Sequence, residues 1–515
     1  MPNSIDFSGR PFHFIGIGGI GMSAIAHILT RRKLPVSGSD IRLTHITQRL
    51  QEQGAHIFLS QEAENLRFFQ SQVSASSSGF SESSSHSEPI LPASNFSMPH
   101  TPSSSEVLPQ VVCSTAIHLD NPEYREALQV GCPIYHRSDI LAALVQHAHG
   151  IAVAGTHGKT TTSSMIGYLL LEAGLDPTIV VGGEVEAWEG NARLGDSDYL
   201  VAEADESDGS LIKFVPKIGV ITNIELDHPD HYQSLDEVVQ TFKTFAQNCT
   251  TVVGCADCDV VMAEIQPTVT YSVRPNIEAT YRADEITYQA DGTRARIWED
   301  QVLLGDLWIP VLGEHNLSNA LAAVAVGRLA GIDFDVIADT FRLFRGARRR
   351  FEHRGECHNI QFIDDYAHHP SEIQATLASA RLQVKKGNTD NAPKRIVAVF
   401  QPHRYSRATM FMDEFGQSFQ DADIVLATEV YSAGEAPTGQ VNGRCLAEAI
   451  AAHQSDVFYR SSLADISALL KQTLIPGDLV VFLGAGNLNR IIPDLLDFYQ
   501  HIQYSDLPTV CSTVA

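Results

Sequence analysis

Apolar and polar residues alternate in a regular way along most of the chain. Short apolar runs, which suit strands buried on both faces, are followed by stretches whose apolar residues repeat with a helical period. The runs that we expect to form strands span residues 12–17, 35–40, 110–117, 151–154, 199–204, 218–224, 362–365, 395–400, 424–428 and 479–483. This alternation predicts an α/β fold in which parallel sheets carry helical connections.

The chain of 515 residues is long enough for three such domains, at roughly 150 residues each. We expect a Rossmann-like first domain over residues 1–149, a central phosphate-loop α/β domain over 150–344 and a C-terminal Rossmann-like domain over 345–515. Within the first domain, fifteen serines fall between Ser71 and Ser105, where apolar residues are few. Such a segment buries too little surface to offset the entropy of ordering, so a disordered insertion is predicted at about 70–107.

Composition narrows the class of protein. The chain has 36 Lys and Arg against 61 Asp and Glu, a formal net charge of −25. This balance argues against nucleic-acid binding, which needs a basic face. The eight cysteines are scattered, and we expect Cys255 and Cys258, the nearest pair, to be reduced thiols. With no leader-like N-terminus and no long apolar run, the sequence predicts a cytoplasmic protein without membrane insertion.

A glycine-rich turn follows the first predicted strand. It reads Gly16-Ile17-Gly18-Gly19-Ile20-Gly21, and Asp40 ends the next strand. Glycines at this spacing let a diphosphate approach the backbone, and the acidic residue is placed for a ribose hydroxyl. The turn alone does not say which diphosphate is bound, so NAD and a nucleotide-sugar both remain open.

A second phosphate-binding pattern opens the central region. The strand at 151–154 runs into Gly155-Thr156-His157-Gly158-Lys159-Thr160-Thr161 and then into an amphipathic helix. Backbone N–H groups of such a loop cradle phosphates, and the helix N-terminus adds a positive dipole. Lys159 is expected to reach the β- and γ-phosphates, and the Thr160 hydroxyl to bind Mg²⁺. The loop is shorter than the standard P-loop, whose first glycine is replaced by Val153; an ordinary strand–helix turn is the alternative.

Acidic and imidazole side chains follow the next two predicted strands. One strand ends in residues 203–208, with four carboxylates, and the other ends in Asn223-Ile224-Glu225-Leu226-Asp227-His228. Because the carboxyl ends of parallel strands gather at one edge, these groups suit Mg²⁺ or Mn²⁺ bound with ATP. Solvated caps are the alternative reading.

Three later segments carry further polar groups. Residues 313–320 open an alanine-rich helix and could cap it or bind a purine and ribose, and the basic run at 345–350 could face phosphate or solvent. The strand at 395–400 ends in Gln401-Pro402-His403-Arg404-Tyr405-Ser406-Arg407, a basic end suited to a carboxylate.

Together these motifs resemble the ATP-dependent Mur ligases of peptidoglycan synthesis, which have the same short phosphate loop. The resembling segments follow the family's order and span nearly the whole chain outside the serine-rich stretch: 16–23, 114–117, 155–161, 203–208, 222–228, 313–316, 364–370 and 401–407. The resemblance implies three domains that bind a UDP-sugar, ATP with Mg²⁺ and an amino acid. It implies an amide ligase that works through an acyl phosphate, most similar to the members that join L-alanine to UDP-N-acetylmuramate. A ligase that recycles a whole tripeptide onto the same sugar is the alternative.

The resemblance also implies roles for individual residues. The UDP-sugar would contact Gly16, Gly18, Gly19, Gly21, Asp40, Ser114, Thr115 and Ala116. ATP would contact Gly155, Thr156, His157, Gly158, Lys159, Thr160, Thr161, His315, Asn316, Asn319, Arg349 and Asp365. A first Mg²⁺ would contact Thr160, and a second metal ion would contact Glu203 and His228. L-alanine would contact Tyr366, His368, Arg404 and Arg407. Lys159, His228 and Arg349 would form the catalytic set.

The chain departs from the family's usual pattern at two positions, where Ala367 replaces glycine and Pro229 replaces methionine. Neither change removes a functional group. Some Mur ligases carry a carbamylated lysine near the metal, but Lys243 lies in an ordinary amphipathic helical pattern and is expected to be unmodified. Two other classes of protein account for fewer of these motifs. An NAD-dependent oxidoreductase would use the first glycine turn but has no use for the phosphate loop of Lys159. A nucleotide-switch protein would use that loop but does not need a second diphosphate site. The sequence leaves the oligomeric state open.

Overall fold

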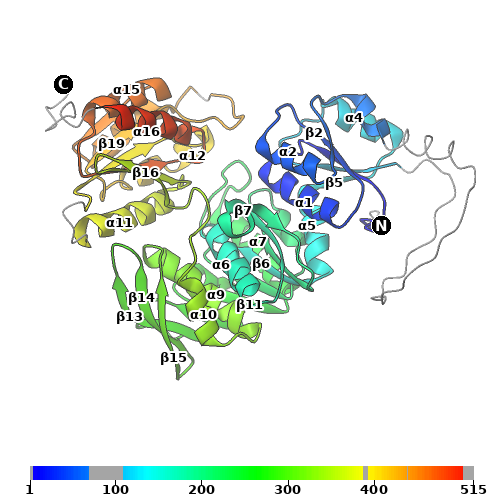
Figure 1. Cartoon of the computed structure of the whole chain (residues 1–515), viewed down its shortest axis with the longest axis horizontal. Coiled ribbons are helices and arrows are strands. Elements are labelled where there is room, and N and C mark those ends of the chain that lie inside the picture. Colours follow the sequence, from blue (N-terminus) through cyan, green and yellow to red (C-terminus); the bar gives the residue numbers. More distant parts are fainter. Residues whose placement is uncertain (1–3, 69–107, 387–391, 438, 503–515) are drawn as a thin grey trace, which may run out of the picture.

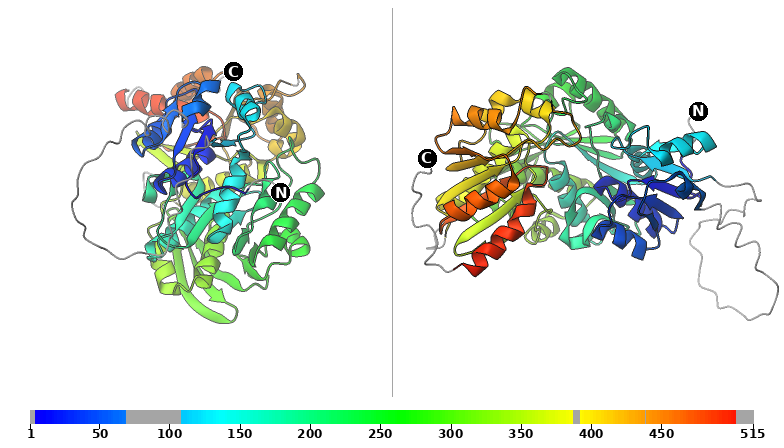
Figure 2. Two further views of the ribbon diagram at one scale, coloured as in Figure 1. Left: turned by 90° about the vertical axis from the view of Figure 1, so that its right-hand side faces the viewer. Right: turned by 90° about the horizontal axis from the view of Figure 1, so that it is seen from above.

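The computed structural model describes residues 4–68, 108–386, 392–437 and 439–502. It contains three α/β units, each built around its own sheet (Figure 1). The central unit, in cyan-green to yellow-green, lies between the N-terminal unit in blue and the C-terminal unit in yellow to red, and the right-hand view of Figure 2 shows the same order. The predicted insertion at about 70–107 falls almost wholly outside the described residues. The three-domain α/β fold is thus confirmed.

The N-terminal sheet has five parallel strands in the order β3-β2-β1-β4-β5. The strands are β1 (Phe12–Ile15), β2 (Val36–Ser39), β3 (His56–Phe58), β4 (Gln110–Cys113) and β5 (Ile134–His136). Its helices are α1 (Ile20–Arg31), α2 (His45–Glu52), α4 (Pro122–Val130) and α5 (Arg137–Gln146), with a 3-10 turn η1 (Ala63–Arg67). All four residues of β1 are buried, as the apolar run predicted. The strand predicted at 110–117 ends earlier, at Cys113, so that small polar residues form a loop at the sheet edge.

The central sheet has ten strands in the order β15-β14-β13-β12-β11-β10-β6-β9-β7-β8. Its strands are β6 (His149–Ala154), β7 (Thr178–Val185), β8 (Gly190–Arg193), β9 (Tyr199–Glu203), β10 (Ile218–Ile221), β11 (Thr251–Cys255), β12 (Val269–Ser272), β13 (Tyr281–Tyr288), β14 (Thr293–Glu299) and β15 (Val302–Ile309). The helical segments are α6 (Lys159–Glu172), α7 (Leu235–Asn248), α8 (Asp259–Glu264), α9 (Glu314–Leu329) and α10 (Phe334–Phe341), with 3-10 turns η2 (Glu186–Trp188) and η3 (Ser210–Lys213). The parallel strands β6, β9 and β10 bring three loops to one edge. The antiparallel meander β13-β14-β15 was not predicted, because its strands alternate polar and apolar residues and lack a continuous apolar run.

The C-terminal sheet has six strands in the order β16-β17-β21-β18-β19-β20, all parallel except β16. The strands are β16 (Glu352–Cys357), β17 (Ile360–Asp365), β18 (Arg395–Phe400), β19 (Ile424–Ala427), β20 (Val457–Tyr459) and β21 (Asp478–Leu483). The helices are α11 (Pro370–Lys386), α12 (Tyr405–Met410), α13 (Met412–Gly416), α14 (Gly443–Ala451), α15 (Leu463–Thr473) and α16 (Ile492–His501), with a 3-10 turn η4 (Leu488–Ile491). The carboxyl ends of β17 and β18 lead into loops that contact the central unit.

Candidate functional site

The phosphate loop is a tight turn between β6 and α6. Gly155 and Gly158 have φ angles of +140° and +82°, which residues with a Cβ rarely adopt. A Cβ on Gly158 would lie 2.5 Å from Asn319 Oδ1, so the loop and α9 are packed too closely for a larger residue. Thr156 is fixed by the backbone N–H of Glu225, which donates to its hydroxyl at 2.8 Å. The loop is therefore held in one shape from both sides.

Lys159, at the first position of α6, turns back over this loop. Its Nζ donates to the carbonyl oxygen of Gly155 at 2.7 Å and to Glu206 Oε1 at 2.9 Å. Burial would lower the pKa of the Lys159 ammonium, but the carboxylates of Glu206, Asp205 and Glu203 outweigh it and raise that pKa. The ammonium thus stays charged at the position where the loop would hold phosphates.

Carboxylates and an imidazole gather beside Lys159. Ligand atoms of Asp205, Glu206 and His228 lie within 4.8 Å of one another. Glu206 is 1% exposed, and its Oε2 has no hydrogen-bond partner in the described part of the chain. Burial raises the pKa of Glu203 despite the nearby charge of Lys159, and the Thr160 hydroxyl bonds to the same carboxylate. An orphaned buried carboxylate oxygen among hard oxygen donors fits Mg²⁺ or Mn²⁺.

The predicted metal ligands do not form one tight group. Thr160 and Glu203 lie together at the start of α6 and the end of β9, whereas His228 lies with Asp205 and Glu206. Lys159 interacts electrostatically with Glu203 of the first group and with His228 of the second, and so lies between these two groups of side chains. The contribution of Glu206 was missed, because residues 203–208 contain four carboxylates and no sequence signal distinguishes Glu206 from the others.

A cavity of about 250 Å³ adjoins the phosphate loop. Its lining includes seven of the residues expected to contact ATP: His157, Gly158, Thr161, His315, Asn316, Asn319 and Asp365. Arg350 also lines it, whereas the expected Arg349 does not. Burial lowers the pKa of His315 to about 4, so its ring is neutral and can take part in neutral hydrogen bonds. Asn319 accepts from the Thr162 hydroxyl at 3.1 Å, and this bond fixes α9 against α6.

Arg349 and Arg350 point in different directions. Arg349 donates to the carbonyl oxygen of Gly484 at 2.5 Å and lies 3.5 Å from Asp364, both in the C-terminal unit. Arg350 donates to the Thr160 hydroxyl at 3.3 Å and lines the 250 Å³ cavity. The geometry therefore favours Arg350, not the predicted Arg349, for an inter-domain phosphate contact. A run of three arginines gives no sequence signal for choosing between them.

A second cavity, of about 590 Å³, is lined from all three units. Ile20 comes from the glycine turn, Thr160 from the phosphate loop and Tyr366 from the end of β17. The guanidinium carbons of Arg349 and Arg350 lie 4.9 and 5.3 Å from the centre of the Tyr366 ring, within the range of cation–π contacts. This cavity joins the first phosphate-binding turn to the second.

The predicted UDP-sugar residues meet at one edge of the N-terminal sheet. The turn of Gly16, Gly18, Gly19 and Gly21 follows β1, Asp40 follows β2, and Ser114, Thr115 and Ala116 follow β4. Asp40 accepts from the backbone N–H of Gly18 at 2.9 Å. This carboxylate therefore braces the glycine turn. Arg137 was not predicted for this site, although it lies against Gly21 and 3.3 Å from Asp205.

The residues expected around the amino acid lie where the C-terminal unit meets the central one. Arg407 is only 2% exposed, and its Nε donates to Asp227 Oδ1 at 2.9 Å. Arg404 is less buried and donates to Asp230 and Glu435 at 3.0 and 3.3 Å. Burial lowers the pKa of His368 to about 4, and this ring lies 5.3 Å from that of Tyr366. The four predicted residues are thus neighbours, but Arg407 is enclosed.

Asp365 is the last predicted nucleotide residue. It ends β17 and accepts from the backbone N–H groups of Phe351 at 2.6 Å and Ala367 at 2.8 Å. Burial raises the pKa of its carboxyl to about 6. Asp365 therefore holds the linker and the 366–370 loop together beside the cavity.

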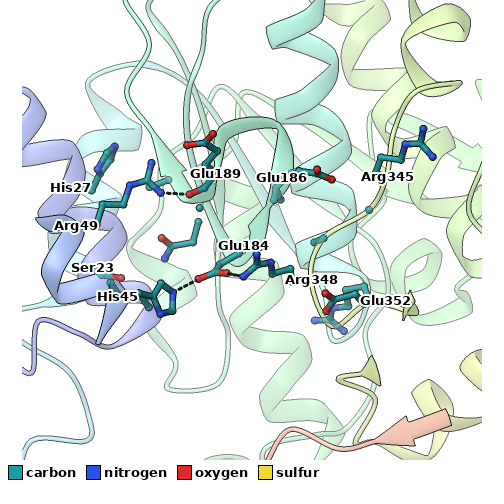
Figure 3. A pocket seen from close by; sticks show the side chains of 18 of the residues that line it. Ser23, His27, His45, Arg49, Glu184, Glu186, Glu189, Arg345, Arg348 and Glu352 are labelled. Carbon is teal, nitrogen blue, oxygen red and sulfur yellow. Dashed lines mark hydrogen bonds and ion pairs between the residues drawn. The ribbon is translucent and has the colours of Figure 1, made fainter. Parts of the chain in front are cut away.

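A third cavity, of about 730 Å³, lies between α1 and α2 on one side and the turn between β7 and β8 on the other (Figure 3). Glu184 links its walls: it accepts from His45 Nε2 at 3.0 Å and from Arg348 at 2.5 Å. Glu184 therefore connects the N-terminal unit to the central unit and to the segment that follows α10. No local pattern predicts this contact, because His45 and Glu184 are far apart in the chain.

Two smaller expectations can be checked here. Cys255 and Cys258 are both free thiols. Lys243 pairs with Glu264 at 2.5 Å on the surface of α7. In the part of the chain that the structure describes, no helix has both the length and the apolar character needed to cross a membrane.

Three family models match the chain in succession. The Mur ligase family, catalytic domain, matches residues 11–149; the Mur ligase middle domain matches 153–327; and the Mur ligase, glutamate ligase domain, matches 349–486.

Known proteins of similar sequence and structure are also found. The UDP-N-acetylmuramate–L-alanine ligase of Nostoc punctiforme is 58% identical over 496 residues, which cover 96% of this chain and 98% of that protein. The ligase of the same name from Cyanothece sp. is 56% identical over 516 residues and 99% of both chains. The crystal structure of UDP-N-acetylmuramate-alanine ligase from Thermotoga maritima matches with a TM-score of 0.74 and 27% identity, over 95% of this chain and 99% of that one. A murein peptide ligase from Psychrobacter arcticus matches with a TM-score of 0.65 and 23% identity, over 96% and 100% of the two chains, which shows a shared fold.

Proposed function

This chain belongs to the Mur ligase family, and we propose that it joins L-alanine to the carboxylate of UDP-N-acetylmuramate with ATP as the energy source. The observation that carries the proposal is the 590 Å³ cavity, to which the glycine turn, the phosphate loop and the C-terminal unit each contribute. An enzyme that activates a sugar carboxylate and then adds an amine needs such a meeting point. The tripeptide-recycling alternative is not favoured, because curated relatives at 55–58% identity carry the alanine-adding name.

Each unit has its own proposed ligand. UDP-N-acetylmuramate would lie on the glycine turn and Asp40, ATP in the 250 Å³ cavity, and L-alanine near Tyr366 and His368. We propose domain limits of 1–149, 150–344 and 345–515, and each family-model match falls within one of these ranges. Because ATP is a cytoplasmic nucleotide, the proposed compartment is the cytoplasm.

Charge neutralisation is the proposed task of the phosphate loop. The Lys159 ammonium would exchange its contact with Glu206 for the β- and γ-phosphates, and Arg350 would approach the γ-phosphate from the linker. Thr160 with Glu203 would hold one Mg²⁺ or Mn²⁺ ion and Glu206 with His228 a second, and both ions would supply further positive charge to the phosphates. Phosphoryl transfer depends mainly on such positioning and electrostatic stabilisation.

The proposed reaction has two steps. An oxygen of the muramoyl carboxylate attacks the γ-phosphorus, the bond to the β-phosphate oxygen breaks, and ADP and an acyl phosphate form. The amine of L-alanine then attacks the acyl carbon, the amine loses a proton, and inorganic phosphate leaves from the tetrahedral intermediate. A free carboxylate has no adequate leaving group, so phosphorylation is the step that makes amide formation possible.

For L-alanine we propose Arg404 as the carboxylate partner, since it is 30% exposed at its side chain. Arg407 would not contact L-alanine itself; it would position Asp227 and the loop that carries His228. Tyr366 and His368 would line the path between the amino acid and the acyl phosphate.

The test is phosphate release from ATP and Mg²⁺ with UDP-N-acetylmuramate, with and without L-alanine, together with mass analysis of the nucleotide-sugar. Release that requires both substrates, with a product one alanyl residue heavier, is expected. Release with the tripeptide but not with L-alanine would move the assignment to the recycling reaction. Absence of release with either amine donor would reject the ligase assignment.

A further inference from the structure

One carboxylate of the C-terminal unit reaches both the phosphate loop and the linker. Glu372 lies in the first turn of α11, and its side chain is 14% exposed. Its Oε2 accepts from the backbone N–H groups of His368 at 3.0 Å and His369 at 3.3 Å. Its Oε1 lies 3.3 Å from His157 Nδ1 and 4.0 Å from an Arg350 nitrogen. Glu372 therefore contacts two groups of the nucleotide site.

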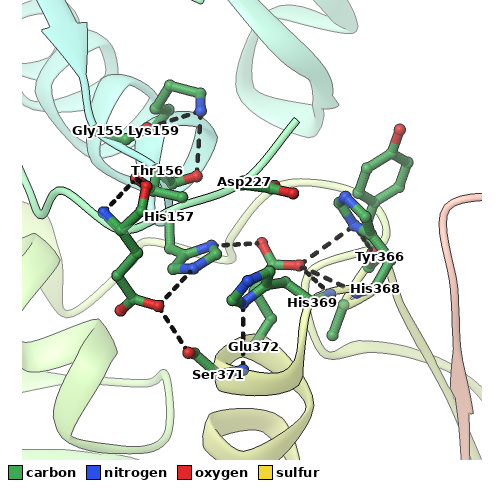
Figure 4. A network of polar contacts seen from close by, with 12 residues as sticks. Gly155, Thr156, His157, Lys159, Asp227, Tyr366, His368, His369, Ser371 and Glu372 are labelled. Atoms are coloured by element: carbon green, nitrogen blue, oxygen red, sulfur yellow. Dashed lines mark hydrogen bonds and ion pairs between the residues drawn. The ribbon is translucent and has the colours of Figure 1, made fainter. Parts of the chain in front are cut away.

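His157, in the middle of the phosphate loop, lies between two carboxylates (Figure 4). Its Nε2 is 3.4 Å from Glu225 Oε2, and its Nδ1 faces Glu372. Burial alone would lower the pKa of the His157 ring, but the two carboxylates raise it to about 10. The ring is therefore an imidazolium at neutral pH and can donate through both nitrogens.

The same two segments are joined a second time. The Ser371 hydroxyl donates to Glu225 Oε2 at 2.8 Å, so Glu225 receives contacts from the phosphate loop and from the start of α11. His157 is also fixed through its backbone, because its N–H donates to Asn223 Oδ1 at 2.8 Å. The N-terminal end of α11 thus closes onto the phosphate loop through a chain of charged hydrogen-bonding groups.

The cluster of His157, Glu225 and His369 also has the composition of a metal site. However, His369 Nδ1 accepts from the backbone N–H of Ser371 at 3.3 Å, which leaves the proton of the neutral ring on Nε2. A protonated nitrogen offers no lone pair to a metal. The cluster is accordingly interpreted as an ionic contact between domains.

We propose that Glu372 is a positioning residue: when the C-terminal domain closes, its carboxylate orients His157 and Arg350 and so sets the phosphate loop for ATP. This inference rests on the proposed function for its kinetic test. The groups that face His157 are Glu225 after β10, Glu372 on α11 and the ring of His369, with Arg350 beyond Glu372. If the C-terminal domain moved away, His157 of the phosphate loop would lose Glu372 and keep only Glu225 as an anionic partner.

The decisive variant is Glu372→Gln. A glutamine oxygen can still accept from the N–H groups of His368 and His369, so the helix cap is kept and only the charge is lost. We expect kcat/KM for ATP to fall at least about tenfold, since displacing a positioning contact by about 1 Å can cost a hundredfold. Without the Glu372 charge the pKa of His157 falls, so activity should begin to decline at lower pH on the alkaline side. Glu299→Gln, which weakens an ion pair with Arg328 in the central unit, is the matched control and should keep the wild-type profile.

A double variant separates this role from simple loss of structure. If Glu372 acts through His157, then His157→Gln with Glu372→Gln should lose less activity than the product of the two single losses. Three results would each overturn the proposal. They are a double variant whose loss equals the product of the two single losses, a Glu372→Gln variant whose activity declines at the same alkaline pH as that of the wild type, and a Glu372→Gln variant whose activity is within about twofold of wild type.

A measurement of Tm against pH in the substrate-free protein tests the His157–Glu372 contact without any enzymatic reaction. It therefore does not depend on the ligase assignment. In the substrate-free protein, the imidazolium stabilises the fold below the ordinary histidine pKa, and this stabilisation is lost as pH rises through about 10. The Tm difference between wild type and Glu372→Gln should therefore shrink between pH 8 and pH 10.5, whether or not L-alanine is the substrate. A constant Tm difference over this range would contradict the His157–Glu372 contact. Failure of the wild-type assay alone would contradict the ligase assignment instead.

Discussion

Arg407 of the C-terminal unit and Asp227 of the central unit form a buried ion pair with two hydrogen bonds. Arg407 Nε donates to Oδ1 at 2.9 Å and its NH2 group donates to Oδ2 at 3.1 Å. Burial alone would raise the pKa of Asp227, but the Arg407 guanidinium holds it far below its usual range. Because Asp227 immediately precedes His228, this pair connects the proposed metal site to the C-terminal domain.

Replacing Arg407 should cost mainly stability. Arg407→Ala would leave the Asp227 carboxylate buried without its partner, which typically costs about 3–5 kcal/mol. Denaturant unfolding of the substrate-free protein measures this loss. Arg404→Ala, which removes the more exposed arginine that immediately precedes α12, is the control and should cost less than about 1 kcal/mol. Equal losses for the two variants would contradict the assignment of Arg407 as the inter-domain anchor.

Removing the Lys159 ammonium should abolish turnover without removing UDP-sugar binding. Lys159→Ala takes away the positive charge nearest the proposed phosphates, and losses of about 100- to 1,000-fold in kcat are expected for such a group. The affinity for UDP-N-acetylmuramate should stay within about twofold, because its proposed site lies in another domain. Lys243→Ala, which breaks a surface pair with Glu264, is the matched lysine control. A comparable loss of UDP-sugar binding in Lys159→Ala would contradict the proposed division of ligands among domains.

The sequence predicted best those features that one continuous segment of the chain forms by itself. The glycines of the turn after β1 and the loop after β6 have fixed spacing, so both turns could be predicted from local pattern. Ten strands with parallel neighbours were predicted, because burial on both faces leaves continuous apolar runs, as in β18. The parallel-paired strands β3, β5, β7, β11, β12 and β20 were not predicted. The meander β13-β14-β15 has no such run, so it was missed.

Side-chain contacts between domains could not be predicted from the sequence. Arg349 and Arg350 are adjacent and identical in type, and no local pattern predicts that Arg349 contacts Asp364 whereas Arg350 contacts Thr160. Glu372 occupies an ordinary first-turn position of a helix, and only the closed arrangement brings its carboxylate to His157. Such pairs depend on how the units dock, which no local pattern records.

The two arginines can be separated by paired substitutions. Arg350→Ala should lower kcat by about 100-fold, because the proposed γ-phosphate contact is lost while Thr160 remains in place. Arg349→Ala should instead lower stability by about 1–3 kcal/mol, because the buried Asp364 carboxylate loses one of its donors. Steady-state kinetics and denaturant unfolding on both variants give the comparison. A larger kcat loss in Arg349→Ala would restore the assignment expected from the sequence.

Stability on the acid side should depend on His403. Burial, together with the nearby charges of Arg407 and Arg404, lowers the pKa of the His403 ring to about 3, well below its ordinary value. Between pH 6.5 and pH 3 the unfolded chain therefore binds a proton that the folded chain does not, so the fold loses stability as pH falls. For this one group the loss amounts to about 2 kcal/mol at pH 5 relative to pH 7. His403→Gln should accordingly flatten the decline of Tm between pH 7 and pH 5, whereas His501→Gln, at an exposed position on α16, should leave the slope unchanged. An unchanged slope in His403→Gln would mean that other buried groups nearby, such as His368 on the loop after β17, account for the acid sensitivity.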